Sequence, residues 1–387
     1  MILLKNLEVY SPAHLGKKDI LTGGGKILSI QDNIELPDKI LQEVIDCTGM
    51  MAVPGLIDAH VHIAGAGGEG GPATRTPELQ LSHMLHAGVT TVVGCLGTDG
   101  LTRSVESVLM KVKALRQEGV SAWMLTGAYQ VPVPSIMGDI GKDISMIEEV
   151  IGVGEVAISD HRSSKPTAAE LARIAQHARV GAMLGGKSGI VNIHMGDEKD
   201  PFRLLYEVSE KFNISLKQFW PTHCNRNTYI FEDAKTYGKQ SYIDLTASSY
   251  PFFPEYEIKP SKAIRELLEA GVPAEHITLT SDACGSLPGF DEDGKVVKLE
   301  MGYPLSVFTE LKDAIRQEKL KIETALSLAT SNVADILKLH NKGRIARGKD
   351  ADLLILDNKL DMVHLLANGK IMVKEGKMLK KGAYEHK

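Results

Sequence analysis

The chain has 387 residues, of which 43% are hydrophobic and 24% charged, a composition that excludes a largely disordered protein. Its formal net charge is -5 and no run of Lys or Arg is long enough to follow a phosphate backbone, so we expect no nucleic-acid partner. No segment approaches the roughly 20 apolar residues that cross a bilayer, and the four cysteines are scattered as in proteins of a reducing compartment. We therefore predict a cytoplasmic protein with no membrane partner.

Short strands are predicted at both ends of the chain. Apolar and polar residues alternate there, and turn residues such as Gly23, Gly24 and Gly25 separate the runs, which is typical of a small antiparallel sheet. Because both ends share this character, we predict one small β-sandwich domain built from residues 1–54 and 340–387. The predicted strands lie in residues 1–10, 25–34, 348–357, 362–370 and 371–380.

The middle of the chain, residues 55–339, is predicted to be a second domain in which strands alternate with helices. In the first helix Thr76 is the expected cap, Pro77 the first helical residue and Gly88 the end. Eight strands, nearly all followed by a helix, are typical of an α/β fold of the (β/α)8, TIM-like barrel type. The strands are predicted in residues 50–63, 90–97, 121–129, 155–162, 189–197, 219–226, 242–249 and 277–285, and the clearest helices in residues 76–88, 104–119, 167–180 and 260–271.

Polar side chains gather at the carboxyl ends of the predicted strands. In a β/α barrel these ends form one mouth, so residues that are distant in the sequence are expected to meet there. The strongest signal is the segment D-A-H-V-H, in which His60 and His62 point the same way along a strand and would reach one metal ion. Other candidates near strand ends are Tyr129, Arg162, His194, His223, Arg226 and Asp282, whereas His83, His86 and His161 are interpreted as structural.

These residues form a set of nitrogen and oxygen donors that suits zinc, with manganese, iron and nickel as alternatives. Five ligands and a bridging carboxylate exceed what one tetrahedral ion takes, so we expect two divalent metal ions per chain, with Zn²⁺ as the expected ion. Such a pair lowers the pKa of a shared water, so that hydroxide exists at neutral pH. Asp282 is placed to ligate one ion, accept the proton of the water as general base, and return it to the leaving amine as general acid.

Over essentially its whole length the chain resembles the amidohydrolase superfamily, and within it the isoaspartyl dipeptidase family. The segment P-G-L-I-D-A-H-V-H and the closing G-R-I-A-R-G-K-D-A-D-L-L-I-L-D are typical of the superfamily. The resemblance to the isoaspartyl dipeptidases is carried by G-A-G-G-E-G-G-P-A-T-R-T-P-E, T-G-A-Y, A-I-S-D-H-R, H-M-G-D, P-T-H-C-N-R and S-D-A-C-G-S. It implies hydrolysis of the β-aspartyl peptide bond of dipeptides by a metal-bridging hydroxide, and a homo-oligomer, an octamer in relatives.

The resemblance also implies a role for each matching residue. His60, His62 and Asp282 would bind the first metal ion, and His194 and His223 the second. Tyr129 would polarise the scissile carbonyl, and the substrate contacts would be Glu69 to the α-amino group, Arg162 and Arg226 to carboxylates, and Gly67, Thr98 and Ser286. A β-aspartyl dipeptide carries one ammonium and two carboxylates, which one acid and two arginines complement.

The sequence departs from the family at the start of the fourth predicted strand. Relatives usually bridge their metal ions there with a carboxylated lysine, whereas this chain has Gly154 and Glu155 and one additional residue. We expect Glu155 to supply the bridging carboxylate, with the additional residue forming a bulge that brings the shorter side chain closer. The alternative is that Glu155 lies behind the ligands and that a single metal ion is bound.

Other functions on the same fold compete with this hypothesis. They include a cyclic-amide hydrolase of the dihydropyrimidinase or dihydroorotase type, and an N-acyl amino acid deacetylase. Glu69 argues against a cyclic imide, because that substrate offers no ammonium. More remote are a metal-free binding or scaffold relative and a single-metal nucleobase deaminase, both of which metal content would test. Simpler interpretations are a solvated charge for Glu69, structural salt bridges for Arg162 and Arg226, and packing for Tyr129.

Overall fold

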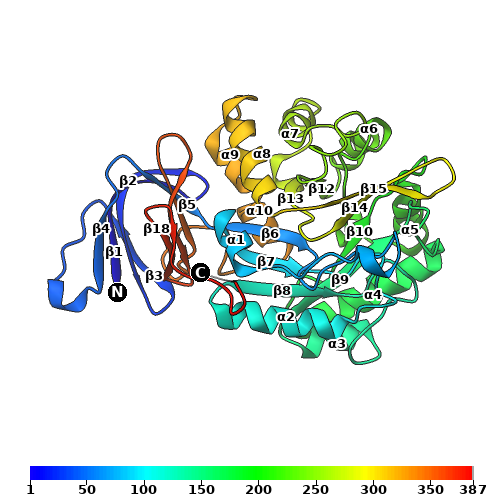
Figure 1. Ribbon diagram of the computed structural model, residues 1–387, viewed down its shortest axis with the longest axis horizontal. Coiled ribbons are helices and arrows are strands. Elements are labelled where there is room, and N and C mark those ends of the chain that lie inside the picture. The colour runs from blue at the N-terminus through cyan, green and yellow to red at the C-terminus, as the bar shows by residue number, and fades with distance from the viewer. Residues whose placement is uncertain (386–387) are drawn as a thin grey trace.

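The computed structural model describes residues 1–385 and places both ends of the chain in one nine-stranded sheet (Figure 1). The strand order is β19-β18-β17-β16-β5-β1-β2-β3, with β4 beside β1. Because β1 runs parallel to both β4 and β5, the sheet is mixed, which corrects the prediction of an antiparallel sheet. The strands are β1 (Ile2–Tyr10), β2 (His14–Gly23), β3 (Lys26–Gln31), β4 (Glu43–Asp46), β5 (Met51–Pro54), β16 (Leu353–Leu356), β17 (Met362–Ala367), β18 (Lys370–Lys374) and β19 (Lys377–Met378).

This sheet encloses one hydrophobic core to which both ends of the chain contribute. Leu4 and Ile20 come from the N-terminal strands, Leu353 and Leu366 come from the C-terminal strands, and all four are fully buried in the same cluster. The alternation along each strand therefore turns one face inward, as expected of half-buried strands. The N-terminal and C-terminal strands thus pack against each other through this core, as the predicted sandwich requires.

Eight parallel strands form the second unit, as predicted for a TIM-like α/β barrel. Six of them, β6 to β11, pair in chain order as one curled sheet, and β12 pairs with β13. Asp282 N donates to His60 O at 3.0 Å and Cys224 N donates to Asp244 O at 3.0 Å, so backbone hydrogen bonds bridge both seams. The strands are β6 (Leu56–Val61), β7 (Val89–Gly94), β8 (Ser121–Thr126), β9 (Val150–Ala157), β10 (Ile190–His194), β11 (Phe219–Thr222), β12 (Ile243–Thr246) and β13 (Ile277–Thr280).

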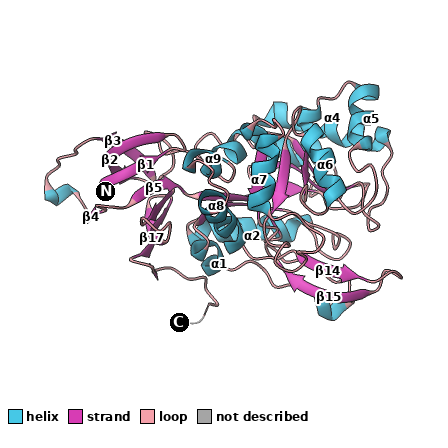
Figure 2. Cartoon of the chain, turned by 90° about the horizontal axis from the view of Figure 1, so that it is seen from above, coloured by secondary structure: helices cyan, strands magenta, loops and turns pink. Residues whose placement is uncertain are grey.

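Helices cover the outside of the barrel (Figures 1 and 2). Local sequence explains their starts: the Ser104 side chain accepts a hydrogen bond from Ser107 N before α2, and Thr167 and Glu170 form a capping box before α4. The helices are α1 (Leu81–His86), α2 (Val105–Glu118), α3 (Ile140–Met146), α4 (Ala168–Gly185), α5 (Arg203–Phe212), α6 (Thr228–Tyr237), α7 (Pro260–Glu269), α8 (Leu305–Arg316), α9 (Ile322–Ser327) and α10 (Ser331–Ile336).

The predicted start of the first helix is wrong. The helix α1 begins at Leu81, after Gln80, so Thr76 and Pro77 lie outside it. Thr76 Oγ1 instead donates to Cys284 O at 2.6 Å and accepts a hydrogen bond from Ala66 N at 2.7 Å. These contacts fix the glycine-rich loop against the last barrel strand, so a tertiary role overrides the capping propensity of threonine.

A buried carboxyl group ties three barrel strands together below the mouth. Asp244 on β12 accepts hydrogen bonds from Thr222 Oγ1 at 2.7 Å, Thr278 Oγ1 at 2.6 Å and Thr280 Oγ1 at 2.6 Å. Burial raises the pKa of Asp244, and these hydroxyl groups partly oppose that rise. Since the three donors come from β11 and β13, the contact fixes the relative positions of strands that carry residues of the mouth.

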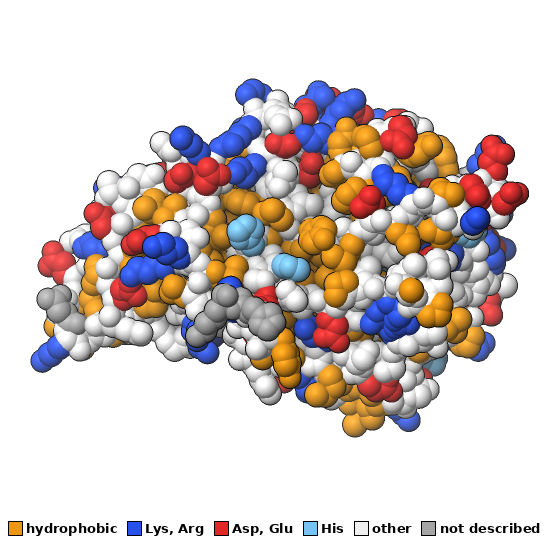
Figure 3. Space-filling model, viewed as in Figure 1, with side chains coloured by type: hydrophobic (Ala, Val, Ile, Leu, Met, Phe, Trp, Pro, Cys, Tyr) orange, Lys and Arg blue, Asp and Glu red, His pale blue; other side chains and the backbone are white. Residues whose placement is uncertain are grey.

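A hairpin and the molecular surface complete the fold. The antiparallel strands β14 (Ser286–Phe290) and β15 (Val296–Met301), which the sequence did not predict, project from the mouth side of the barrel (Figure 2). Positive and negative side chains are interspersed on the face that Figure 3 shows, with no large basic patch there. Among residues 1–385, no helix is long and apolar enough to cross a membrane.

Candidate active site

The two histidines of β6 face two carboxylates at the mouth of the barrel. Nε2 of His62 lies 3.0 Å from Oδ1 of Asp282 and 3.4 Å from Oε1 of Glu155. Nε2 of His60 lies 3.4 Å from the other oxygen of Glu155 and 3.8 Å from Oδ1 of Asp282. All four side chains are buried, so three strand ends converge on one small volume as the sequence predicted.

A second pair of histidines meets the same glutamate from the other side. Nδ1 of His194 lies 3.0 Å and Nε2 of His223 lies 3.5 Å from Oε2 of Glu155. His223 Nδ1 is 2.6 Å from Thr246 Oγ1, a contact that fixes the orientation of its ring. Burial, together with the nearby His194, lowers the pKa of His223 to about 4, so its imidazole is neutral near pH 7, as a metal ligand must be.

Glu155 lies near the end of its strand, which corrects the prediction that the strand begins there. The strand β9 starts at Val150, and all eight of its residues are buried. Gly154 has space for a hydrogen atom only, because a Cβ there would lie 2.8 Å from the Cβ of Asn192. Burial opposes ionisation of Glu155, but His60 and the other imidazoles hold the pKa of its carboxyl group well below the usual range.

The bulge expected beside Glu155 is present. The pairing of β10 with β9 passes from Val191 opposite Val153 to Ile193 opposite Val156. One residue of β10 therefore faces two residues of β9, which is the geometry of a β-bulge. The bulge changes the direction of the backbone at the position of Glu155. The carboxylate of Glu155 lies within 3.5 Å of nitrogens of both histidine pairs.

The donor set fits a divalent metal ion. Within residues 1–385, both ring nitrogens of His60 and Nδ1 of His62 are buried without a hydrogen-bond partner, a costly arrangement that a bound cation relieves. The described residues contain two groups of possible metal ligands. Within each group the ligand atoms all lie within 4.8 Å of one another, and both groups contain Glu155. The first group is His60, His62, Cys95 and Glu155, and the second is Glu155, His194 and His223.

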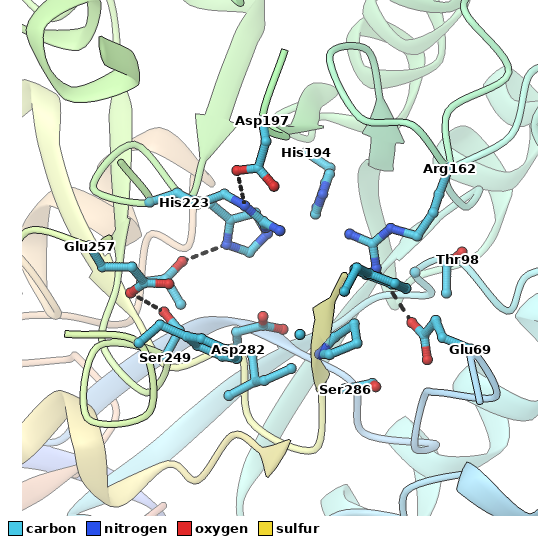
Figure 4. A pocket seen from close by; sticks show the side chains of 18 of the residues that line it. Glu69, Thr98, Arg162, His194, Asp197, His223, Ser249, Glu257, Asp282 and Ser286 are labelled. Atoms are coloured by element: carbon cyan, nitrogen blue, oxygen red, sulfur yellow. Dashed lines mark hydrogen bonds and ion pairs between the residues drawn. The ribbon is translucent and has the colours of Figure 1, made fainter. Parts of the chain in front are cut away.

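A cavity of about 430 Å³ opens above this cluster. Figure 4 shows Asp282, His194 and Asp197 near its middle, Glu69, Thr98, Arg162 and Ser286 toward one end, and Ser249 and Glu257 toward the other. The predicted residues that line the cavity are His62, Glu69, Thr98, Tyr129, Glu155, Arg162, His194, His223, Arg226, Asp282 and Ser286.

Arg162 is held rigidly at one end of the cavity. Its Nε and Nη2 donate to the two oxygens of Asp160 at 2.9 and 2.8 Å, and Nη1 lies 3.4 Å from Oε1 of Glu69. The guanidinium carbon lies 5.4 Å from the ring centre of Tyr129 and 5.9 Å from that of Phe290. This bidentate pair and the two aromatic faces orient a cation toward the cavity.

Glu69 and Tyr129 both line the cavity, and they differ in whether their polar atoms have partners in the protein. Oε2 of Glu69 is buried and has no hydrogen-bond partner among the described residues. The hydroxyl of Tyr129 lies 2.7 Å from Nδ1 of His194. Burial and the negative charge of Glu155 raise the pKa of Tyr129 well above its ordinary value, so the phenol stays protonated and can donate.

Some predicted residues lie elsewhere or are already paired. Gly67 does not line the cavity, whereas the neighbouring Ala66 does, because Gly67 packs against the backbone of Thr74, where a Cβ would lie 2.6 Å from the carbonyl oxygen. Arg226 lines the cavity but its Nε already donates to Asp197 Oδ1 at 2.9 Å. His161, with 56% of its side chain exposed, and the α1 residues His83 and His86 lie outside the cluster.

Sequence reasoning missed several residues of the site. Asp160 and Asp197 stand in the strand-end motifs A-I-S-D-H-R and H-M-G-D, and this position signalled them. Cys95 lies within the strand predicted for residues 90–97, and the sequence pattern marks it only as one of four scattered cysteines. Glu257 and Phe290 lie in a loop and a hairpin, where no periodic pattern marks a residue that faces the cavity.

A barrel with histidines and a glutamate buried at the carboxyl ends of its strands defines a metal-binding hydrolase of the amidohydrolase class. The model of the Amidohydrolase family matches residues 51–378, and the chain belongs to this family. Within it, the chain is similar to the solved β-aspartyl dipeptidase of the thermophilic, keratin-degrading Fervidobacterium islandicum AW-1, crystallised in complex with the β-Asp-Leu dipeptide. The two are 42% identical, the match covers 97% of this chain and 98% of that chain, and the TM-score is 0.91.

Two further relatives share less of the sequence of this chain. The dihydroorotase of Listeria monocytogenes serotype 4a (strain HCC23) is 25% identical, over 92% of this chain and 89% of its own length. A solved D-hydantoinase is 16% identical with a TM-score of 0.72, covering 99% of this chain and 97% of that chain, and this likeness shows the fold alone.

Proposed function

We propose that this chain hydrolyses the β-aspartyl peptide bond of dipeptides. The observation that carries the proposal is the unpartnered, buried Oε2 of Glu69 beside Arg162, at one end of a cavity whose middle holds the histidine cluster. An acid and an arginine 3.4 Å apart complement the α-ammonium and α-carboxylate that an isoaspartyl residue carries side by side. The complex of the 42% identical dipeptidase with β-Asp-Leu supports the same substrate class.

The proposed centre holds two divalent ions, with Zn²⁺ as the expected metal. His60, His62 and Asp282 would hold the first ion, His194 and His223 the second, with Glu155 between them. When bound, the two ions would lower the pKa of a water molecule between them and polarise the scissile carbonyl. The shared position of Glu155 in both groups of donors supports its role in place of a carboxylated lysine.

The protein residues would supply the proton transfers. Asp282 accepts a proton from the attacking water as the new carbon–oxygen bond forms, and delivers it to the leaving nitrogen as the carbon–nitrogen bond breaks. The protonated hydroxyl of Tyr129 donates a hydrogen bond to the carbonyl oxygen, where negative charge develops. Asp160 pairs with Arg162 and lies 3.0 Å from Nε2 of His194. It would therefore fix the position of the substrate-binding arginine relative to a metal-binding histidine.

Substrate binding is proposed at both ends of the cavity. Glu69 accepts hydrogen bonds from the α-ammonium, and Arg162 pairs with the α-carboxylate of the aspartyl residue. Arg226 pairs with the carboxylate of the leaving residue. Thr98 and Ser286 add hydroxyl groups to the aspartyl end of the cavity, where Figure 4 shows them beside Glu69.

We also propose a division into two domains, a homo-oligomer and a cytoplasmic location. Ile345 and Ala351 pack in the core of the small domain, which supports a division into residues 1–54 with 340–387 and residues 55–339. Exposed Met183 and Leu184 at the end of α4 support contact with further copies in a homo-oligomer, which sedimentation velocity would test. All four cysteines are free, which supports a cytoplasmic location.

The decisive experiment compares β-Asp-Leu, α-Asp-Leu and dihydroorotate as substrates of the purified protein, with metal content measured in the same sample. We expect cleavage of the β-linked dipeptide alone, with about two metal ions per chain. Cleavage of α-Asp-Leu at a similar rate would overturn the substrate assignment. Turnover of dihydroorotate alone would favour the cyclic-amide alternative, to which the 25% identical dihydroorotase points.

A further inference from the structure

We propose that the thiolate of Cys95 is a ligand of the first metal ion, joining His60, His62 and Glu155; this inference rests on the metal centre of the proposed function. Cys95 follows the end of β7, and its backbone N donates to Val61 O at 3.1 Å, which places it beside the histidines of β6. Its side chain is fully buried, and its sulfur belongs to the group of four ligand atoms that lie within 4.8 Å of one another.

The surroundings of the sulfur distinguish it from an inert core thiol. Sγ of Cys95 has a long contact of 3.8 Å to Val61 O, and its thiol also faces the imidazole of His60. Among the residues that the structure describes, both ring nitrogens of the neighbouring His60 are buried without a hydrogen bond of normal geometry, so the same space lacks a group that both residues can bind. Among the described residues, Cys47 and Cys284 belong to no such group of ligand atoms.

The chemistry of this donor set is that of zinc. Two imidazoles, a thiolate and the carboxylate of Glu155, with Asp282 as a further donor of the proposed first site, suit zinc, whose distance to sulfur is about 2.3 Å. Ligation breaks the S–H bond of Cys95, the proton passes to solvent, and the sulfur donates an electron pair to the ion. A soft sulfur donor favours zinc over manganese, which prefers oxygen ligands.

Cobalt substitution provides a readout that is independent of activity. The metal is removed from the full-length protein with a chelator, Co²⁺ is added, and the near-ultraviolet absorption is recorded. We expect a thiolate-to-cobalt charge-transfer band in the wild type and in Cys47→Ser, and no such band in Cys95→Ser. We also expect Cys95→Ser to lower zinc affinity at least about tenfold, since residues behind the ligands already cost that much.

The outcomes separate this inference from the proposed function. A band that persists in Cys95→Ser, or a wild type that binds cobalt without any band, would overturn the ligand role of Cys95. Hydrolysis of β-Asp-Leu by the wild type, measured in parallel, would leave the proposed function standing in either case. If Cys95→Ser does not fold, X-ray absorption of the zinc-loaded wild type decides, because a shell without sulfur at about 2.3 Å would contradict the inference.

Discussion

Oε2 of Glu155 lies 3.0 Å from Nδ1 of His194, while Oε1 of the same carboxylate lies 3.4 Å from Nε2 of His62. One side chain therefore faces both histidine pairs. We predict that Glu155→Ala reduces metal content from about two ions per chain to at most one, measured by elemental analysis. The control is Glu148→Ala, which changes an exposed acid just before β9. A variant that keeps two ions would refute the bridging role of Glu155.

The unpartnered oxygen of Glu69 predicts a binding defect. Replacement by glutamine removes the charge that faces the α-ammonium, and hydrogen bonds between charged groups contribute about 1.5–3 kcal/mol. We expect Glu69→Gln to raise KM for β-Asp-Leu about 10- to 100-fold in steady-state assays. Glu78→Gln, which changes an exposed acid outside the cavity, is the matched control. If KM is unchanged, the ammonium is bound elsewhere.

The position of the Tyr129 hydroxyl predicts a defect in the chemical step. Removing one donor from a developing oxyanion typically lowers kcat about 10²- to 10³-fold. Tyr129→Phe is expected to show such a fall in kcat with metal content unchanged, as measured by steady-state kinetics and elemental analysis. Tyr242→Phe, which lies outside the cavity, serves for comparison. A kcat equal to that of the wild type would show that Tyr129 only packs against His194.

Glu257 predicts a dependence of stability on pH. Burial raises the pKa of Glu257 from 4.5 to about 7, although its Oε2 accepts a hydrogen bond from Ser249 Oγ at 2.6 Å. The folded protein thus holds this proton more tightly than the unfolded chain does. Its stabilising contribution is complete below pH 4.5 and is lost as pH rises through about 7.

Glu257→Gln removes this titration. We expect the variant to gain stability relative to the wild type between pH 5 and pH 8, measured as the shift of the urea midpoint. The exposed Glu255 of the same loop provides the control Glu255→Gln. A constant difference between variant and wild type across this range would contradict the raised pKa.

The three hydroxyl groups around Asp244 predict a structural defect. Asp244→Ala leaves the hydroxyl groups of Thr222, Thr278 and Thr280 without their buried acceptor, and each unpaired group costs about 1–3 kcal/mol. We expect a loss of about 3 kcal/mol in urea unfolding. Asp233→Ala, which changes an exposed acid, is the control and is expected to leave the free energy of unfolding nearly unchanged. Equal stability of the two variants would show that the barrel relaxes around position 244.

Much of the fold and the metal cluster could be predicted because they follow from local patterns. Apolar runs separated by amphipathic helical stretches indicated the eight barrel strands, and parallel strands bring their carboxyl ends to one edge. His60, His62, His194, His223 and Asp282 therefore had to approach one another once the barrel was recognised. The start of β9 was missed, since a fully buried strand such as V-I-G-V-G-E-V-A has no alternation to mark its beginning.

The tertiary structure alone decided which side chains meet across loops and seams. Thr76 leaves its predicted helix for a carbonyl 208 residues away, and Glu257 and Phe290 reach the cavity from segments without periodicity. The sulfur of Cys95 is a candidate metal ligand only because the fold places it beside His60, on the neighbouring strand. The sequence by itself determined the barrel and its ring of histidines, because periodicity fixes strands and their faces. Packing decided the bulge at Glu155 and the loop contacts, because these depend on distances between segments that local sequence does not encode.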